Sequence, residues 1–329
     1  MCVNDDKYDS EGYFYKVLFA NKTTRQVRLV MSKILKVFED PYWALGVILR
    51  RLFSRFMSDE TFVCWEYFSG MGKFPNLNHP VTYNEKLQWL KLNDIHPEYS
   101  RMVDKYEAKE YVRTIIGNEH IIPTLGVWES WDDIDFSILP EKFVLKTTHD
   151  SGGVAVCKDK SMRTLRKAKK KICKSLKHNY FYEHREYPYK GIKPRIIAEQ
   201  FMVDESGTEL KDYKFFCFNG MPKMLFVATD RPFDTRFDFF DMEWNHLPFK
   251  QGHPLATKEI RKPVGFEKMK ELSRKLSQDF PHVRVDLYDI NGQIYFGELT
   301  FFHFSGNVPF EPEEWDYKIG EWLELPFEN

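Results

Sequence analysis

The sequence predicts a mixed α+β fold, and three observations lead to this prediction. The chain has 329 residues, of which 43% are hydrophobic, so it can form about two packing units. Residues before Gly117 favour helices, whereas short β-rich runs follow Gly117. Two helical stretches, Met162 to His178 and Glu267 to Asp279, separate these runs. Strands with interspersed helices after a helical N-terminal region are typical of α+β proteins.

The N-terminal region, residues 1–117, is expected to be mainly helical. Apolar residues recur at helical spacing between Val27 and Phe68, and Asp40-Pro41 suits a break between two helices. Basic side chains accompany this pattern. They leave two interpretations open, a solvated helix face or a peripheral contact with an anionic membrane surface.

Seven short runs rich in β-branched and aromatic residues predict strands. These runs are 143–146, 154–157, 195–199, 213–218, 224–228, 283–288 and 294–299. Asn291-Gly292 lies between the last two and predicts a hairpin, because both residues readily adopt positive φ. Upstream, Thr82 followed three residues later by Glu85 is a capping-box pattern and predicts a helix from Tyr83 to Leu92.

The total charge is balanced, with 48 basic and 49 acidic residues, which argues against a dedicated nucleic-acid binder. This balance is the sum of two opposed segments. Lys158 to Arg195 contains fourteen basic and three acidic residues, whereas Glu298 to Asn329 contains eight acidic residues and one lysine. The basic segment predicts an amphipathic helix whose lysines form either a solvated face or a platform for a phosphate-bearing substrate. Its apolar face would consist of Met162, Leu165, Ala168, Ile172 and Leu176.

Cysteine usage and the N-terminus favour a cytoplasmic protein. The five cysteines are far apart and include no CxxC pair, which argues against a disulfide framework or a zinc site. The first ten residues are polar and acidic, unlike a secretory signal. The apolar run Tyr42 to Leu49 is far shorter than the roughly 20 residues of a membrane-spanning helix. A peripheral position at the inner face of the cell membrane stays open.

A glycine-containing loop between two predicted strands is the first candidate for chemistry. The strand 143–146 ends in Lys146, and the loop contains His149, Asp150 and Ser151-Gly152-Gly153. Backbone N–H groups of such a loop can cradle phosphate oxygens, with the lysine adding positive charge. Many hairpins contain two glycines, so an ordinary turn is the alternative.

The hairpin of the last two predicted strands is the second candidate. Because alternate side chains of a strand share a face, Arg284 and Asp286 point to the same side. Asp286 and Glu298 flank the turn on adjacent strands, where two carboxylates could share Mg²⁺ together with substrate phosphates. An ion-pair network of the same residues on the sheet surface is the alternative.

The strand 195–199 and its continuation, Gln200 to Asp204, form the third candidate. A strand that leaves through a short hinge could receive an adenine ring, with backbone groups at the ring edge and apolar side chains on its faces. The alternative is a plain connection between two domains.

The order of these segments resembles the ATP-grasp superfamily, and more closely its TupA-like branch, found among capsule and teichuronopeptide synthesis proteins. The resemblance runs from roughly Phe74 to Gly320. The segments that carry it are Asp104-Lys105-Tyr106, Lys146 with its Ser-Gly-Gly loop, Ile197 to Phe201, Asp212 to Lys214, Arg284 to Asp286, and Gly297 to Thr300. The fold it implies has two α+β subdomains that sandwich ATP, here a lid subdomain at 118–200 and a C-terminal subdomain at 201–329.

The resemblance also implies a role for each matching residue. Nucleotide-binding residues would be Lys105, Lys146, Ser151, Gly152, Gly153, Glu199, Phe201, Met202, Asp204 and Lys214, with Glu205 as an alternative ribose partner. Glu199, Phe201 and Met202 would line the adenine hinge. Arg284, Lys146 and Lys214 would be the catalytic residues, and Asp286, Glu298 and Thr300 the Mg²⁺ ligands. Many relatives have asparagine at the position of Thr300, so water would complete a weaker metal site here.

The activity that the resemblance implies is an ATP- and Mg²⁺-dependent carboxylate–amine ligase that forms an amide through an acylphosphate. The partners would be an amine and a carboxylate-bearing sugar or glycan of a bacterial surface polysaccharide, with no nucleic acid. His149 and His303 could assist the amine as bases, although structural roles suit both. A sugar phosphotransferase, a glycosyltransferase and a non-enzymatic polysaccharide-binding protein are the alternatives.

Overall fold

The computed structural model describes residues 54, 56–204, 210–230 and 234–326. The chain divides into two compact units, Met1–Ser54 and Arg55–Asn329, and the fold described below is that of the second. The helices predicted between residues 27 and 53, with their break at Asp40-Pro41, therefore lie outside the described residues.

Four helices come first in the described chain: α3 (Asp59–Met71), α4 (Tyr83–Asn93), α5 (Tyr99–Val103) and α6 (Glu107–Ile116). The predicted capping box is confirmed. The Thr82 hydroxyl accepts from the Glu85 backbone N–H at 3.2 Å, and the Glu85 carboxylate accepts from the Thr82 backbone N–H at 3.2 Å. Both orphan N–H groups at the start of α4 are thereby satisfied, which fixes where the helix begins.

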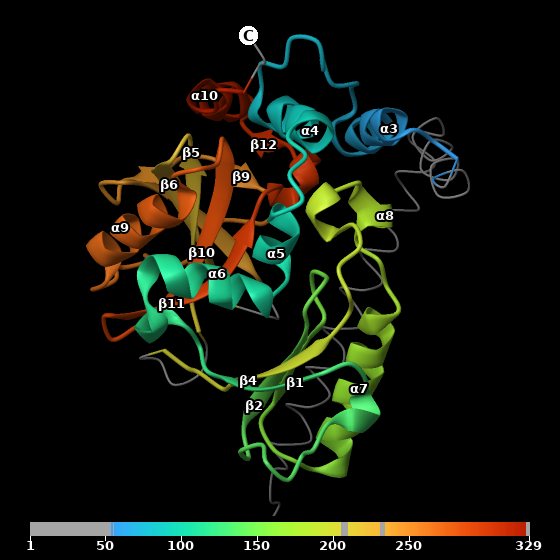
Figure 1. The fold of residues 1–329 in the computed structure, drawn as a ribbon. Helices are drawn as coiled ribbons and strands as arrows, with labels where there is room; N and C mark the ends of the chain where they lie inside the picture. Colours follow the sequence, from blue (N-terminus) through green and yellow to red (C-terminus); the bar gives the residue numbers. More distant parts are fainter. Residues whose placement is uncertain (1–53, 55, 205–209, 231–233, 327–329) are drawn as a thin grey trace, which may run out of the picture. The chain divides into compact units, whose positions relative to one another are not determined.

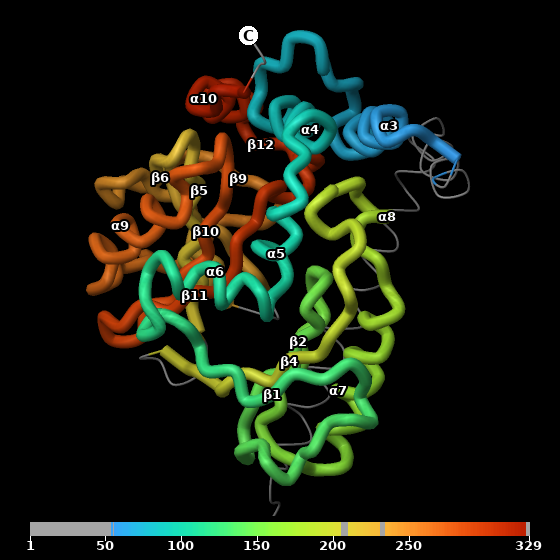
Figure 2. Tube along the Cα trace, in the orientation of Figure 1, coloured from blue at the N-terminus to red at the C-terminus, as the bar shows by residue number. Residues whose placement is uncertain are grey.

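A four-stranded antiparallel sheet, which we call the lid sheet, follows. It contains β1 (Thr124–Trp128), β2 (Phe143–Thr147), β3 (Val154–Cys157) and β4 (Ile196–Gln200) in the order β1-β4-β2-β3. The basic segment forms α7 (Met162–Leu176), which packs beside β2 and β3 (Figure 1). Along the trace in Figure 2 these elements are contiguous, from green to yellow.

The predicted apolar face of α7 is correct in its centre and wrong at its first residue. Ala168 and Ile172 are buried against the lid sheet, and Leu165 and Leu176 pack beside them. Met162 is 75% exposed. It occupies the first helical position, and the buried residues of α7 begin only at Ala168, so helical spacing alone did not locate the edge of the core.

A second antiparallel sheet, which we call the metal sheet after the Mg²⁺ ligands expected on it, has six strands in the order β11-β10-β5-β6-β7-β8. Its strands are β5 (Asp212–Phe218), β6 (Met221–Thr229), β7 (Arg236–Asp241), β8 (His246–Leu247), β10 (His282–Ile290) and β11 (Gln293–Thr300). Helix α9 (Phe266–Ser277) packs against β5, β6 and β10. The predicted mixed α+β fold is confirmed.

Several smaller elements complete the fold. They are α8 (Phe181–His184), α10 (Glu314–Trp322) and the two-residue strands β9 (Lys250–Gln251) and β12 (Phe310–Glu311), which pair with each other. α10 packs on α4, where the Asn84 backbone N–H donates to Asp316 Oδ1 at 2.9 Å. A single large core joins α4, α6, α9, α10 and the metal sheet.

The register of β5, β10 and β11 positions the candidate metal residues. Asp286 on β10 lies opposite Glu298 on β11 and opposite Lys214 on β5. The predicted hairpin is confirmed, with φ of 55° at Asn291 and 88° at Gly292. Since this turn fixes the β10–β11 register, it also sets which side chains meet across the two strands.

All seven predicted strands and both predicted helices after Gly117 are present, with ends shifted by a few residues. Several elements were not predicted: β1, β7, β8, β9, β12, α8 and α10; α5 and α6 lie within the region 1–117 that was expected to be helical. Most of them are short, and β1 and β7 contain glycine or acidic residues that weaken the β-strand signal. Across the described ranges, no helix combines the length and apolar character required to cross a membrane.

Candidate active site

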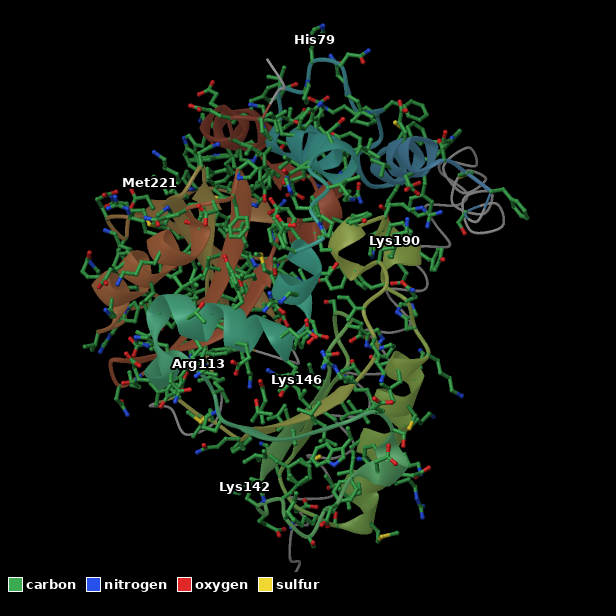
Figure 3. All side chains as sticks on the ribbon, viewed as in Figure 1. His79, Arg113, Lys142, Lys146, Lys190 and Met221 are labelled. Atoms are coloured by element: carbon green, nitrogen blue, oxygen red, sulfur yellow. The ribbon has the colours of Figure 1, made fainter. Side chains whose placement is uncertain are left out.

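A buried ionic cluster, which we call the lid cluster, lies at the lid sheet. Lys146 on β2 and Lys109 on α6 contact different oxygens of Glu199 on β4, at 2.6 Å and 2.5 Å. Lys109 also donates to the carbonyl oxygen of Ile122 and to Thr124 Oγ1, both at 2.9 Å. Lys146 lies on the side of the lid sheet that faces the metal sheet (Figure 3).

The charges of this cluster shift the pKa of each member. Burial opposes ionisation of Glu199, but Lys146 and Lys109 outweigh it and lower the pKa to about 2. Burial acts to lower the pKa of Lys146, but the charge of Glu199 outweighs it and the pKa is raised. For Lys109 burial dominates and the pKa is lowered. The carboxylate is therefore ionised at neutral pH between two lysines.

Sequence reasoning assigned Glu199 to the adenine hinge and did not single out Lys109. Glu199 is 4% exposed and both oxygens of its carboxylate contact lysines, Lys146 and Lys109. Lys109 stands in the middle of an ordinary amphipathic helix pattern, and α6 packs against α9 and β11, from where the Lys109 side chain reaches Glu199 of the lid sheet. No local signal could have found it.

Lys105 connects the start of α6 to the glycine-containing loop. Its backbone N–H donates to the Thr148 carbonyl oxygen at 3.0 Å, and its Nζ donates to the Asp150 carbonyl oxygen. Burial lowers the pKa of Lys105, while the negative charges of Glu298 and Asp150 act in the opposite direction. Carboxylates of both the loop and the metal sheet therefore influence the pKa of Lys105.

The loop Asp150–Gly153 is anchored at its base and open at its tip. The Asp150 carboxylate accepts from the hydroxyls of Thr147 and Ser175, which are themselves 2.8 Å apart. A Cβ at Gly153 would lie 1.8 Å from Thr147 Oγ1, so only glycine fits there. Ser151 and Gly152 are exposed, and Gly152 has φ of 96°. An anchored base with a bare tip suits a loop that covers a ligand.

The predicted hinge residues follow β4 directly. Phe201 and Met202 are partly buried. Asp204 is buried and accepts from the backbone N–H and from Nζ of Lys211, at 3.2 Å and 3.0 Å. Glu205, the alternative ribose partner, lies outside the described residues. The hinge assignment stays a prediction.

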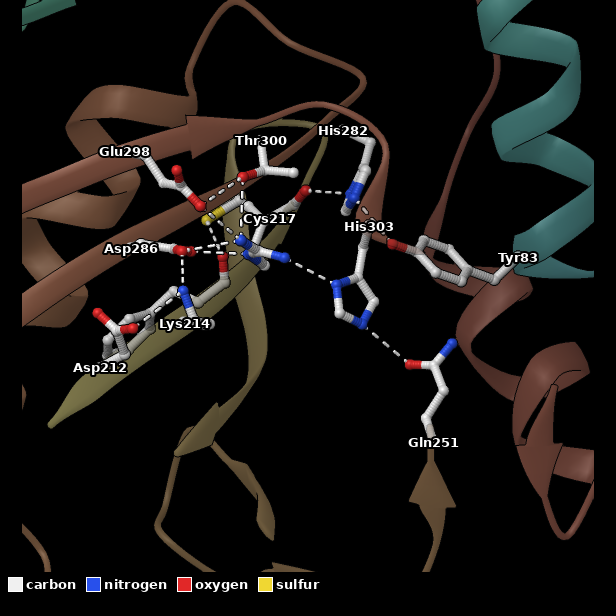
Figure 4. A network of polar contacts seen from close by, with 12 residues as sticks. Tyr83, Asp212, Lys214, Cys217, Gln251, His282, Asp286, Glu298, Thr300 and His303 are labelled. Carbon is white, nitrogen blue, oxygen red and sulfur yellow. Dashed lines mark hydrogen bonds and ion pairs between the residues drawn. The ribbon is translucent and has the colours of Figure 1, made fainter. Parts of the chain in front are cut away.

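The second ionic cluster, which we call the metal-sheet cluster, lies on β5, β10 and β11 (Figure 4). Arg284 donates from Nε and Nη2 to the two oxygens of Asp286, at 2.7 Å and 2.8 Å. Nη2 also donates to Glu298 Oε1 at 3.1 Å and to Thr300 Oγ1 at 3.0 Å. Lys214 contacts Asp286 directly and lies 3.4 Å from Asp212. The strand register therefore gathers the three predicted metal ligands with two of the three predicted catalytic residues, Arg284 and Lys214, whereas Lys146 lies in the lid cluster.

Burial and neighbouring charges act differently on the two carboxylates of this cluster. For Asp286 burial outweighs the charges of Arg284 and Lys214, and the pKa is raised. Removal from water opposes ionisation of Glu298, but Lys214, Arg284 and Lys105 outweigh it and lower the pKa to about 2. Burial acts to lower the pKa of Arg284, but Asp286 and Glu298 raise it above its usual value. Glu298 and Asp212 also act on Lys146 of the lid cluster, so the two clusters influence each other electrostatically.

The donor set fits a hard cation that keeps water and phosphate ligands. The Glu298 side chain is 40% exposed, and its Oε2 has no hydrogen-bond partner among the described residues. Asp286 is buried beside it, and the Thr300 hydroxyl lies 3.4 Å from Glu298 Oε1. No cluster of three His, Cys, Asp or Glu side chains suited to a metal ion occurs within the described residues. One or two carboxylates supplemented by phosphate oxygens are what Mg²⁺ commonly uses.

The two candidate bases are both buried. His303 is 1% exposed and uses both ring nitrogens, Nδ1 with Arg284 at 2.8 Å and Nε2 with Gln251 at 3.1 Å. These contacts leave no nitrogen to take a proton from an amine. His149 contacts the carbonyl oxygen of His178 through Nε2 at 2.9 Å, which ties the loop to the end of α7.

Tyr189, in a short helical turn (Tyr187–Tyr189), is a further side chain near the site that sequence reasoning missed. Burial raises the pKa of its hydroxyl, and the charges of Glu186, Glu298 and Asp150 raise it further, against the influence of Arg284. Its ring packs on Tyr180 with centroids 4.7 Å apart. Tyr189 thus lies within electrostatic reach of both the loop and the metal-sheet cluster.

The comparisons with solved structures give distant similarities. A D-alanine–D-alanine ligase from Helicobacter pylori is 18% identical, with 68% of this chain and 61% of that chain covered and a TM-score of 0.36. An N5-carboxyaminoimidazole synthase from Aspergillus clavatus is 14% identical, with 70% and 54% covered and a TM-score of 0.39. The chain thus spans less than two thirds of the length of either protein. No curated protein matches the sequence.

The family comparison covers much more of the chain. The model described as TupA-like ATPgrasp matches residues 85–324, which include both sheets and both ionic clusters. The matched range begins inside α4 and ends just after α10. The chain therefore belongs to the TupA-like ATP-grasp family.

Proposed function

We propose that the protein is an ATP- and Mg²⁺-dependent carboxylate–amine ligase. The observation that carries this proposal is the pair of buried clusters of opposite character. Three lysines, Lys105, Lys109 and Lys146, accompany the single carboxylate of Glu199 at the lid sheet. Carboxylates predominate in the metal-sheet cluster. A site for a nucleoside triphosphate and its divalent cation requires cationic groups for the phosphates and anionic groups for the metal ion.

In this proposal the lid side binds the phosphates of ATP. Lys105, Lys146 and Lys214 neutralise phosphate oxygens, and the Ser151–Gly153 backbone covers them. Phe201 and Met202 pack on the adenine, and Asp204 contacts the ribose. Lys109 and Glu199 keep Lys146 extended toward the nucleotide. This last role is supported by the contacts of Glu199 with both lysines.

Asp286, Glu298 and the Thr300 hydroxyl would hold Mg²⁺, which would offset the charge that develops on the phosphate oxygens. Glu298 has an oxygen available and a carboxyl pKa of about 2, so it is ionised throughout the physiological range. Arg284 fixes the orientation of both carboxylates through its bonds to Asp286 and Glu298.

The reaction consists of two balanced steps. An oxygen of the substrate carboxylate attacks the γ-phosphorus of ATP, the bond to the bridging oxygen breaks, and ADP leaves. The amine nitrogen then attacks the carbonyl carbon of the acylphosphate, phosphate leaves, and the amine releases a proton. The loop Asp150–Gly153 would exclude water between the steps, because acylphosphates hydrolyse readily.

For the carboxylate substrate, we propose a uronic acid of a surface polysaccharide or its precursor. The exposed face of α7 supports an acidic glycan. Six of its basic side chains, Arg163, Arg166, Lys167, Lys170, Lys171 and Lys174, have no acidic partner within the described residues. A hollow of about 340 Å³ between the loop Asp150–Gly153 and the C-terminal half of α7 includes Lys171 and Lys174. Unpaired lysines beside a cavity attract anionic groups.

The use of ATP and the cysteine chemistry support a cytoplasmic location. The four described cysteines are free thiols: Cys64, Cys157, Cys173 and Cys217. Free thiols are typical of a reducing compartment. A peripheral contact through the basic N-terminal region belongs to the same proposal and concerns residues outside the described range.

A phosphate-release assay tests the activity. Purified protein with MgATP should release phosphate only when a uronic acid and an amino-acid pool are both present. Lys146→Met should abolish turnover, whereas Lys142→Met, an exposed lysine just before β2, should not. Full activity of the Lys146 variant contradicts the site. Phosphate transfer to a sugar hydroxyl without an amine would replace the ligase by a phosphotransferase.

A binding experiment tests the glycan. Lys170→Gln, Lys171→Gln and Lys174→Gln together should weaken binding to polygalacturonate at least tenfold. The charge-matched control replaces Lys268, Lys270 and Lys275 of α9, which lie near Glu267 or Glu271, by glutamine. Equal losses in both triple variants, or equal binding of neutral dextran, would contradict the proposed role of α7.

A further inference from the structure

A chain of hydrogen bonds runs from the metal-sheet cluster to the carbonyl group of Val308. Arg284 Nη1 contacts His303 Nδ1 at 2.8 Å, and His303 Nε2 contacts Gln251 Oε1 at 3.1 Å. Gln251 Nε2 then donates to the Val308 carbonyl oxygen at 3.1 Å. The labelled side chains in Figure 4 show His303 standing between Gln251 and the cluster.

The direction of every bond in this chain follows from its two ends. A guanidinium only donates, so His303 Nδ1 must accept and carries no proton. The proton of the neutral ring is then on Nε2, which donates to Gln251 Oε1. Since the Val308 carbonyl only accepts, the Gln251 amide has its N–H₂ group on that side. The chain therefore specifies one tautomer of His303 and one orientation of Gln251.

The surroundings of His303 hold its ring in place. The ring is packed against Phe216 and Phe226, with centroid distances of 4.8 Å and 5.4 Å. Burial lowers the pKa of His303 far below its usual value, and the charge of Arg284 lowers it further. A neutral ring with both nitrogens bonded acts as a fixed acceptor rather than as an acid or base.

Gln251 is fixed equally well. It is 1% exposed and lies on β9, where its backbone pairs with Phe310 of β12. The short β9–β12 pair thus provides a rigid support behind His303. Without His303 Nδ1 as an acceptor, Nη1 of Arg284 would lose its hydrogen bond on the side away from Asp286.

We propose that His303 and Gln251 are positioning residues that orient Arg284, and through it the carboxylates of Asp286 and Glu298. This inference rests on the proposed function of the cluster as a metal and phosphoryl-transfer site. Nη2 of Arg284 divides its bonds among Asp286, Glu298 and Thr300, and the bond from Nη1 to His303 fixes the plane of the guanidinium. Supports of this kind set the geometry of metal-binding carboxylates.

His282 provides a matched control. It is also buried and neutral, it also packs near Phe216, and it lies two residues before Arg284 on β10. Its bonds go elsewhere, to the Cys217 carbonyl oxygen at 2.9 Å and to the Tyr83 hydroxyl at 3.0 Å. Loss of His282 should therefore affect stability without changing the orientation of Arg284.

The kinetic test compares His303→Ala, His303→Asn and His282→Asn in the full chain. We expect His303→Ala to lower kcat about 10- to 100-fold with little change in the KM for ATP. His303→Asn can place an acceptor near the former Nδ1 and should recover a large part of the loss. His282→Asn should keep kcat within about threefold of the wild type when assayed below its unfolding temperature. Equal kcat values for His303→Ala and the wild type would overturn the inference.

A spectroscopic test does not depend on turnover. With ¹⁵N-labelled histidine and arginine, the wild type should show His303 protonated at Nε2 alone and a slowly exchanging guanidinium of Arg284. Gln251→Met removes the acceptor of Nε2 and should loosen the ring, so that exchange at Arg284 accelerates, and His303→Ala should accelerate it further. Unchanged Arg284 exchange in both variants would contradict the positioning role even if the protein lacked ligase activity. A wild type with the expected spectra and no activity would instead contradict the proposed function.

Discussion

The two ionic clusters both combine basic and acidic side chains, but they carry an excess of opposite charge. In the lid cluster Lys109 and Lys146 share the one carboxylate of Glu199, and Lys105 lies near them. In the metal-sheet cluster Asp286 and Glu298, with Asp212 nearby, surround Lys214 and Arg284. The surplus is cationic at the lid sheet and anionic at the metal sheet. Each surplus suits the opposite charge of a phosphate or of a metal ion.

The comparison also shows that burial alone does not set the charge behaviour of a lysine. Burial acts to lower the pKa of both Lys105 and Lys146, yet only the pKa of Lys105 ends below its usual value. Lys146 has Glu199 at 2.6 Å, whereas Lys105 Nζ donates to the carbonyl oxygen of Asp150. Lys105 is therefore the lysine whose charge a bound phosphate would stabilise most.

Removal of the lid carboxylate should have the largest effect. Glu199→Gln leaves Lys109 and Lys146 buried without their counter-charge, and we expect a loss of about 3–5 kcal/mol in the free energy of unfolding. Urea denaturation measures this loss. Glu129→Gln, which breaks the exposed pair with Lys193, should cost less than about 1 kcal/mol. Similar losses for the two variants would show that the lid cluster is not a buried unit.

Neutralising Glu298, whose side chain is 40% exposed, should affect catalysis more than folding. Asp286→Asn should also lower the free energy of unfolding, because it leaves Arg284 and Lys214 without their buried counter-charge. Asp286→Asn or Glu298→Gln should lower kcat by about 10²–10³-fold, because charge stabilisation in the transition state is lost. Mg²⁺ titration of turnover measures the effect. Glu243→Gln, an exposed carboxylate in the turn after β7, is the control and should retain activity. A variant of Asp286 or Glu298 with wild-type kcat would remove the basis for calling this cluster a metal site.

A fall in pH should destabilise the metal sheet, near His282, before it destabilises the lid sheet, near Glu199. Burial lowers the pKa of His282, beside the metal-sheet cluster, from 6.5 to about 3. The neutral ring therefore contributes stability above pH 6.5 that is lost as the pH falls from 6.5 toward 3, about 2 kcal/mol of it between pH 8 and pH 5. Glu199, with its pKa lowered from 4.5 to about 2, keeps its contribution above pH 4.5 and loses it as the pH falls toward 2.

Hydrogen exchange read by mass spectrometry, corrected for the intrinsic rate, distinguishes the regions. At pH 5, β10 and β5 should lose protection relative to pH 8, while β2 and β4 should retain it. The control is His282→Asn, which should be less stable at pH 8 but show a pH dependence smaller by about 2 kcal/mol. Parallel loss of protection in both sheets would contradict this separation.

The smallest expected effect concerns Thr300, which gives Arg284 an acceptor at 3.0 Å. Thr300→Val removes one hydrogen bond and one oxygen near Glu298, worth about 0.5–1 kcal/mol. The Mg²⁺ concentration for half-maximal activity should rise about two- to fivefold. Thr300→Ser keeps the hydroxyl and should behave like the wild type. An unchanged Mg²⁺ dependence in Thr300→Val would exclude Thr300 from the metal environment.

Most of the metal-sheet cluster could be predicted from the sequence, whereas much of the lid cluster could not. Arg284, Asp286 and Glu298 lie on two strands joined by an Asn291-Gly292 turn, and alternation along a strand predicts which side chains share a face. In the lid cluster, Lys109 and Glu199 are far apart in sequence and meet only because the Lys109 side chain reaches from α6, which packs against α9 and β11, to β4 of the lid sheet. Helical spacing also predicted that Met162 is covered, although it is 75% exposed.

The amino-acid sequence by itself determined the local features: the helix start at Thr82, the turn at Asn291-Gly292, and the strands that carry Lys146 and Asp286. These depend on backbone preferences and on the periodicity of neighbouring residues, which act over a few positions. Only the tertiary structure decided that His303 is held between Arg284 and Gln251, 52 residues away, rather than free to act as a base. Such contacts depend on which elements pack together, and no local pattern specifies that choice.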